Sequence, residues 1–104
     1  MDYASADIAK AAMSEGHMPV LLQFSAEWCD SCRKIAPLID EIGAVFKKRI
    51  RVMTIDVETS ADLAQEFGVA AVPSLVMIKE GSIRGKLVGV TTRRQVAAFL
   101  EDYI

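Results

Sequence analysis

The feature that most constrains the fold is the succession of an apolar run, a helical pattern and a second apolar run over residues 20–57. Val20–Phe24 is a short, mostly apolar run that suits a buried strand, and residues 31–47 repeat apolar side chains at the helical period. Residues 50–57 are apolar and β-branched, which indicates another strand. A strand, a helix and a strand in this order predict two parallel strands joined by a right-handed crossover.

The rest of the chain adds helices on either side of this unit and a hairpin after it. The same criteria predict a helix over 5–16 and a short helix that Ser60 caps and Gly68 ends. They also predict strands over 74–78 and 84–90 around Glu80-Gly81, and a last helix capped by Thr91 or Thr92. The hairpin contributes antiparallel strands. The sequence therefore predicts an α/β chain with a mixed sheet of four or five strands and helices on both faces.

Length and charge limit what such a chain does. We expect one domain over residues 1–104, because 104 residues of which 52% are hydrophobic suffice for one core. The net charge of -2, from 12 basic and 14 acidic residues, argues against nucleic acid as a partner. No apolar stretch approaches the roughly 20 residues that cross a membrane, and the first residues lack the pattern of a secretion signal. A cytoplasmic monomer is expected.

The two cysteines, Cys29 and Cys32, point to chemistry rather than to a structural staple. A bridge between them closes too short a loop to stabilise the fold much. They follow the first predicted strand and open the long helix, whose N-terminus favours an anion and lowers the pKa of a thiol there. We expect Cys29 to attack a partner's disulfide and Cys32, one turn further on and more buried, to resolve the mixed disulfide.

A metal site is the alternative use of two thiols. Zinc takes four ligands, and His17 is the only other soft candidate, so one chain cannot complete such a site. A metal bridging two chains stays open. We expect no metal and no cofactor besides a redox-active Cys29–Cys32 disulfide.

Four segments resemble the thioredoxin family in their order and nearly in their spacing. They are Phe24–Pro37 with Trp28-Cys29-Asp30-Ser31-Cys32, then Val72-Pro73-Ser74, then Lys79-Glu80-Gly81, and finally Val88-Gly89. The resemblance implies a thioredoxin fold and a cis peptide bond before Pro73. It also implies a substrate groove lined by Trp28, Val72, Pro73, Val88, Gly89 and Val90. An extended partner peptide would pair with the backbone of Val72.

The chain departs from the family's pattern at a few positions that tune the site. Asp30 and Ser31 stand where the family commonly has Gly-Pro, and the negative charge of Asp30 is expected to raise the pKa of the Cys29 thiol. Gln23 and Val52 stand where it usually has a buried acid and often a lysine. We infer that Gln23 points toward the space under Cys32 and holds a water or a backbone group. The family's first strand is expected to be missing or reduced to residues 2–4.

Two functions from different classes fit these residues. The first is a thiol–disulfide oxidoreductase, a thioredoxin-type reductase of protein disulfides that a thioredoxin-reductase-type donor recharges. The second is a binding or assembly module of the same fold whose two cysteines are dispensable. The unusual Gln23 and Asp30-Ser31 give the second some weight.

Overall fold

The computed structural model describes residues 2–89 and 92–103. Strands and helices alternate along the chain before a hairpin and a last helix. In order they are α1 (Ala6–Glu15), β1 (Val20–Ser25), α2 (Asp30–Val45), β2 (Arg51–Asp56), α3 (Ala61–Glu66), β3 (Ser74–Lys79), β4 (Ser82–Val88) and α4 (Arg93–Leu100). This order is the one that the periodicity of the sequence predicts.

The four strands form one mixed sheet in the order β2-β1-β3-β4. β1 runs parallel to β2, with Gln23 opposite Thr54, and antiparallel to β3. β3 and β4 are antiparallel neighbours. The α/β class, the mixed sheet and the thioredoxin fold expected from the sequence are therefore confirmed.

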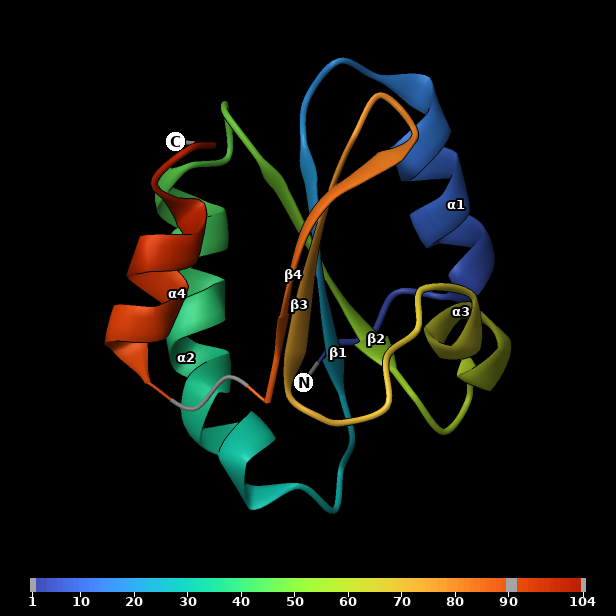
Figure 1. The fold of residues 1–104 in the computed structure, drawn as a ribbon, viewed down its shortest axis with the longest axis vertical. Coiled ribbons are helices and arrows are strands. Elements are labelled where there is room, and N and C mark those ends of the chain that lie inside the picture. Colours follow the sequence, from blue (N-terminus) through green and yellow to red (C-terminus); the bar gives the residue numbers. More distant parts are fainter. Residues whose placement is uncertain (1, 90–91, 104) are drawn as a thin grey trace.

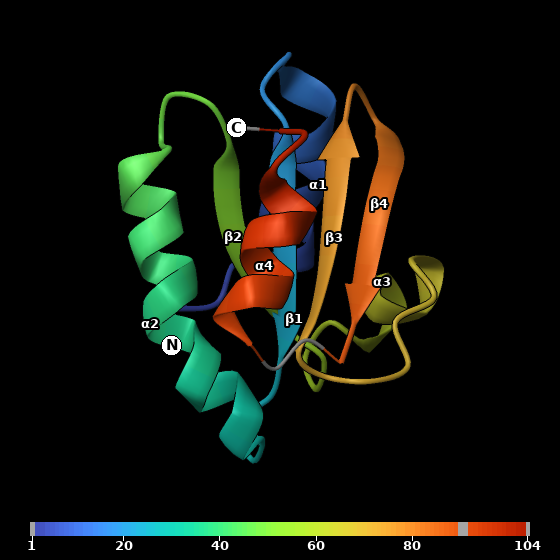
Figure 2. The same ribbon diagram turned by 60° about the vertical axis from the view of Figure 1, so that its left-hand side comes forward.

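α1 and α3 cover one face of the sheet, and α2 and α4 cover the other (Figure 1). Alternate residues of β1 enter different cores, because successive strand side chains point to opposite faces. Leu22 and Phe24 pack with Ala9 and Ala12 of α1 and with Leu63 of α3. On the other face Leu21 packs with residues of α2 and α4, namely Ile35, Ile39, Ile42, Val96 and Leu100. Figure 2 shows α4 in front of the sheet and α1 behind it.

The β3–β4 hairpin is closed by a two-residue turn, Glu80–Gly81. Both residues have positive φ, 53° and 78°, which is the backbone of a type I′ turn. The tight turn lets β4 begin at Ser82 rather than at residue 84, and β4 ends at Val88. The expected strand over 84–90 was therefore set two residues too late, with Val90 outside the described residues.

The N-terminal segment adds only a remnant of a strand. Tyr3 forms an isolated parallel bridge with Thr54, and the backbone N–H of Ala4 donates to the Thr54 carbonyl oxygen at 2.8 Å. The expectation of a first strand reduced to residues 2–4 is confirmed. Beyond this bridge, β2 forms the edge of the sheet.

Two helix starts show where capping patterns succeed and fail. Thr92 caps α4 through a capping box with Gln95. Ser60 occupies the N-cap of α3, but its side chain makes no capping hydrogen bond, so that part of the expectation is wrong. Among the described residues, no helix is both long enough and apolar enough to cross a membrane.

Candidate active site

Cys29 and Cys32 lie where β1 leads into α2. β1 ends at Ser25, and Cys29 is the N-cap residue of α2, so the two cysteines stand on the first turn of the helix. They form a disulfide with their Cα atoms 5.2 Å apart. The one-turn spacing in the sequence thus becomes a closed redox pair at the carboxyl end of a central strand.

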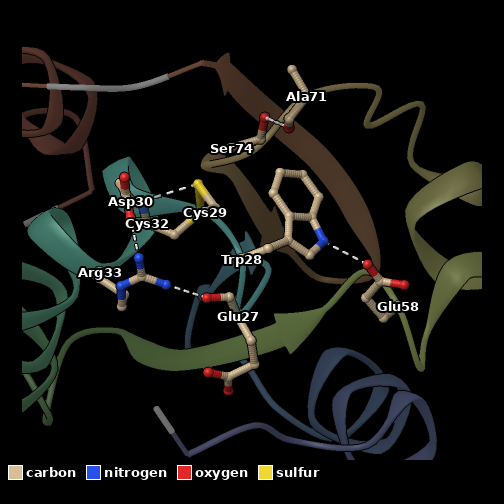
Figure 3. Close-up of a disulfide and its surroundings, with 9 residues drawn as sticks. All are labelled: Glu27, Trp28, Cys29, Asp30, Cys32, Arg33, Glu58, Ala71 and Ser74. Carbon is tan, nitrogen blue, oxygen red and sulfur yellow. Dashed lines mark hydrogen bonds and ion pairs between the residues drawn. A yellow bond between two sulfur atoms is a disulfide. The ribbon is translucent and has the colours of Figure 1, made fainter.

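The two sulfurs have different surroundings. Cys29 is 7% exposed, whereas Cys32 is completely buried. The sulfur of Cys29 accepts a hydrogen bond from the backbone N–H of Cys32, with N···Sγ 3.1 Å (Figure 3). Unpaired N–H groups at a helix N-terminus stabilise an anion, so reduction would leave a thiolate at Cys29 already facing a donor.

Trp28 lies beside the disulfide with most of its indole in solvent. It is 65% exposed, and its Nε1–H donates to the Glu58 carboxylate at 2.5 Å (Figure 3). Trp28 and Val72 line a hollow of about 150 Å³ together with Val57 and residues 69–71. Trp28 and Val72, both expected in the substrate groove, are thus brought together.

The segment before β3 closes the site from the other side. The Val72–Pro73 peptide bond is cis, as the resemblance implied. Val72 packs against the cluster of Ala26, Cys29 and Cys32. The Ser74 hydroxyl donates to the Ala71 carbonyl oxygen at 2.5 Å and is fully buried.

The end of β4 reaches the same end of the sheet. Val88 lies opposite Ser74 in the β3–β4 register and is 51% exposed. Gly89 follows it, also exposed. Val90, which the resemblance assigns to the groove, lies outside the described residues.

The dipeptide between the cysteines faces solvent. Asp30 and Ser31 are both exposed. Asp30 forms an ion pair with Arg33, one turn further along the exposed face of α2. The charge of Asp30 thus has a counter-charge beside it, and its expected effect on the pKa of the Cys29 thiol stays a prediction.

Gln23 lies in the middle of the sheet and is 1% exposed. It shares a face with Leu21, the face that α2 covers, as strand alternation predicts. Its Oε1 accepts from the Thr54 hydroxyl at 3.2 Å, a side-chain partner that was not expected. The expected contact of Gln23 with a water or a backbone group stays a prediction. Within the described chain, its Nε2 has no hydrogen-bond partner.

The sequence matches one known family along nearly its whole length. The sequence model of the thioredoxin family matches residues 4–102.

The chain belongs to the thioredoxin family.

Its similarity to characterised thioredoxins is moderate but extends over most of both chains. It is 34% identical to the thioredoxin of Pseudomonas aeruginosa over 86 residues, which are 83% of this chain and 80% of that one. It is 33% identical to the thioredoxin of Haemophilus influenzae over 87 residues, which are 84% and 81% of the two chains. For the chloroplastic M-type thioredoxin of Chlamydomonas reinhardtii the identity is 30%, over 94% of this chain and 70% of that one.

Thioredoxin membership and the Cys29–Cys32 pair together identify a thiol–disulfide oxidoreductase. Among the described residues, no group of three or more histidine, cysteine, aspartate or glutamate side chains could hold a metal ion.

Sequence reasoning missed several residues of this thioredoxin-type site. Glu58 and Thr54 reach Trp28 and Gln23 across 30 and 31 residues of sequence, so no local pattern marks them. The partner of Asp30 had a visible signal, because an acid and an arginine three residues apart on a helix lie side by side.

Proposed function

We propose that this chain is a protein-disulfide reductase that cycles between a Cys29/Cys32 dithiol and a disulfide. The observation that carries the proposal is the pairing of Cys29 Sγ with the Cys32 N–H at the start of α2. The N-terminus of the helix stabilises the thiolate form of Cys29, which is the attacking form of a thiol.

The reaction balances in two steps. The Cys29 thiolate attacks one sulfur of the partner's disulfide, which forms a mixed disulfide and releases the partner's other sulfur as a thiolate. Cys32 then loses its proton and attacks the Cys29 sulfur, which forms the internal disulfide and releases the second sulfur of the partner. Two electrons pass to the partner, and two protons end on its thiols. A reductase-type donor restores the dithiol with two electrons, and two protons come from the donor or from water.

The partner's chain would lie across the exposed side chains of Trp28 and Val88 and beside Val72 and Pro73. Pairing of an extended peptide with the backbone of Val72 would hold the scissile disulfide at Cys29. We further infer a monomer in the cytoplasm, where a reducing poise keeps the dithiol available for electron transport and redox homeostasis. Sedimentation and cell fractionation test these two points.

Reduction of insulin by dithiothreitol tests the activity, because the released B chain precipitates. The wild-type chain should shorten the lag before turbidity appears, whereas a Cys29→Ser variant should behave like dithiothreitol alone. Equal lag times for the two proteins would contradict the proposal and favour a binding module with dispensable cysteines.

A further inference from the structure

Arg33 connects the two segments of chain that flank Cys29. It lies one turn into α2, and its guanidinium points back toward the start of the helix (Figure 3). Nη2 forms an ion pair with Oδ1 of Asp30, the residue after Cys29. Nη1 donates to the backbone carbonyl oxygen of Glu27, two residues before Cys29. One side chain therefore ties residues 27 and 30 together around the reactive cysteine.

Only an arginine makes this pair of contacts easily. Its guanidinium carries several N–H donors in a rigid, planar fork, whereas a lysine presents one compact ammonium group. Figure 3 shows Arg33 on the opposite side of Cys29 from Trp28, which Glu58 holds. Cys29 is thus flanked by two side chains that are each fixed by a hydrogen bond.

The position of Arg33 is not explained by the stability of the helix. The positive end of the helix dipole lies at the N-terminus and disfavours a cation in the first turns. The pair is also exposed, with the two side chains 51% and 81% accessible, and exposed ion pairs contribute little to folding. An effect on the site is the better explanation.

The charges near Cys29 indicate how Arg33 affects the site. The groups packed on the disulfide are uncharged: Ala26, Val57 and Val72. Figure 3 draws four charged side chains near the disulfide, those of Glu27, Asp30, Arg33 and Glu58, and Arg33 is the positive one among these four. The Glu27 carboxylate points away from Cys29, and the Glu58 carboxylate accepts from the Trp28 indole. Without Arg33, the carboxylate of Asp30, the residue next to Cys29, would lose its ion-pair partner beside a sulfur that forms an anion.

We propose that Arg33 is a positioning residue, which holds Asp30 and the Glu27 carbonyl in place on both sides of Cys29 and cancels the charge of Asp30 beside the reacting sulfur. This inference rests on the proposed redox cycle of Cys29. Arg33 does not touch the sulfur; it acts through Asp30 and the backbone of residue 27.

The first test compares Arg33→Gln with the reduced wild-type chain by thiolate absorbance against pH. At about 7 Å, an unscreened carboxylate would raise the pKa of the Cys29 thiol by about 0.4 to 1.7. We expect Arg33→Gln to raise that pKa within this range. The equilibrium with glutathione should also shift toward the internal disulfide, because the reduced form loses stabilisation.

Lys34→Gln is the matched control. It removes the same charge from the next residue, which is exposed and makes no ion pair within the described chain. We expect a clearly smaller pKa change from this substitution. If Lys34→Gln shifts the pKa as much as Arg33→Gln, or if Arg33→Gln leaves it unchanged, the proposal is wrong.

Two further variants separate the charge of Arg33 from its bridging role. Arg33→Lys keeps the charge but not the fork, so the pKa of the Cys29 thiol should lie between those of wild type and Arg33→Gln. Asp30→Asn combined with Arg33→Gln removes both charges and should return the pKa close to wild type. A double variant that titrates like Arg33→Gln alone would contradict the pairing.

The titration also distinguishes this inference from the proposed function. It needs only the reduced, folded chain and no partner disulfide. If the wild-type chain fails the insulin assay while Arg33→Gln still raises the pKa of the Cys29 thiol, only the reductase proposal is contradicted. If the wild-type chain is active but Arg33→Gln leaves the pKa of the Cys29 thiol unchanged, only this inference is contradicted.

Discussion

At the scale of single residues, the site is defined by small differences between neighbours. Cys29 and Cys32 lie three residues apart, yet only Cys29 retains access to solvent and caps the helix. Exposure and position on the helix both support the proposal that Cys29 is the attacking thiol.

This assignment predicts different products from two serine variants. Cys32→Ser should accumulate mixed disulfides with protein substrates, because nothing resolves them, and Cys29→Ser should accumulate none. In the reduced wild type, alkylation at neutral pH should label Cys29 first, since a pKa lower by one gives about tenfold more thiolate near neutrality. Mass spectrometry of partially labelled chains measures the order, and faster labelling of Cys32 would reverse the roles.

The buried position of Gln23 predicts that an acid placed there lowers the stability of the chain at neutral pH. Gln23→Asp would introduce a carboxyl in a site that is 1% exposed, with uncharged Val52 nearby on β2, so its pKa should rise above the usual value of about 4. Because the unfolded carboxyl ionises first, the free energy of unfolding should fall as pH rises above about 4 and level off beyond the raised pKa. If the pKa of the new carboxyl is one unit higher in the folded than in the unfolded chain, the free energy of unfolding should fall by about 1.4 kcal/mol.

Chemical denaturation between pH 4 and 8 measures this loss, with Gln23→Asn as an uncharged control. Stopped-flow kinetics should show an acidic group in the resolving step of Gln23→Asp only. If the wild type already shows such a group, another base serves Cys32 and the amide at position 23 does not limit resolution.

The sequence predicts residues of the site well where the chemistry is local. The spacing of Cys29 and Cys32 and their place before a helix suffice to predict the redox pair. The hydrogen bond of Trp28 to Glu58 depends on how the loop after β2 approaches the start of α2, which is a result of tertiary packing. The side-chain partner of Gln23 likewise depends on the parallel register with β2.

At the scale of elements, the hairpin turn holds a residue that is not ideal for its backbone conformation. Glu80 has φ of 53°, in the left-handed region that glycine and asparagine tolerate best. Gly81 satisfies the second position of the type I′ turn. Glycine after glutamate was enough to predict a hairpin, but not the two-residue length that starts β4 at Ser82.

Glu80→Asn should therefore stabilise the chain. We expect the free energy of unfolding to rise by about 0.5 to 1 kcal/mol, because asparagine adopts this backbone at lower cost. Urea unfolding measures the change. Glu80→Ala is the matched control, since alanine also carries a Cβ that disfavours positive φ. A gain in Glu80→Ala as large as in Glu80→Asn would assign the effect to charge rather than to backbone conformation.

At the scale of the whole molecule, residues far apart in sequence set how the N-terminal segment joins the sheet. Tyr3 bridges to Thr54 on β2 and is partly buried. Burial raises the pKa of Tyr3 above 10, and the carboxylates of Glu27 and Asp56 raise it further. The sequence suggested a remnant of a strand here, but it did not indicate that the tyrosine would be partly buried.

The raised pKa of Tyr3 predicts a loss of stability in alkali. Below pH 10 the tyrosine is neutral in both states, and above it the unfolded chain releases the proton first, so the free energy of unfolding should fall as pH rises through the pKa of the folded state. Tyr3→Phe should have a shallower slope than wild type between pH 9 and 11. All other ionisable groups are common to the two proteins, so the comparison isolates the tyrosine. Parallel slopes would contradict the burial of the hydroxyl.

The single bridge at Tyr3 also bears on how the molecule behaves in a crowded solution. An uncovered strand at the rim of a sheet is a template on which other chains can extend the sheet, the first step toward aggregation. The β4 rim carries exposed Arg84 and Lys86, whose charges repel such an approach. The β2 rim relies on three residues tethered through Tyr3 and Ala4. Colloidal stability of this chain therefore depends on its N-terminal tether, far in sequence from the cysteines that do its chemistry.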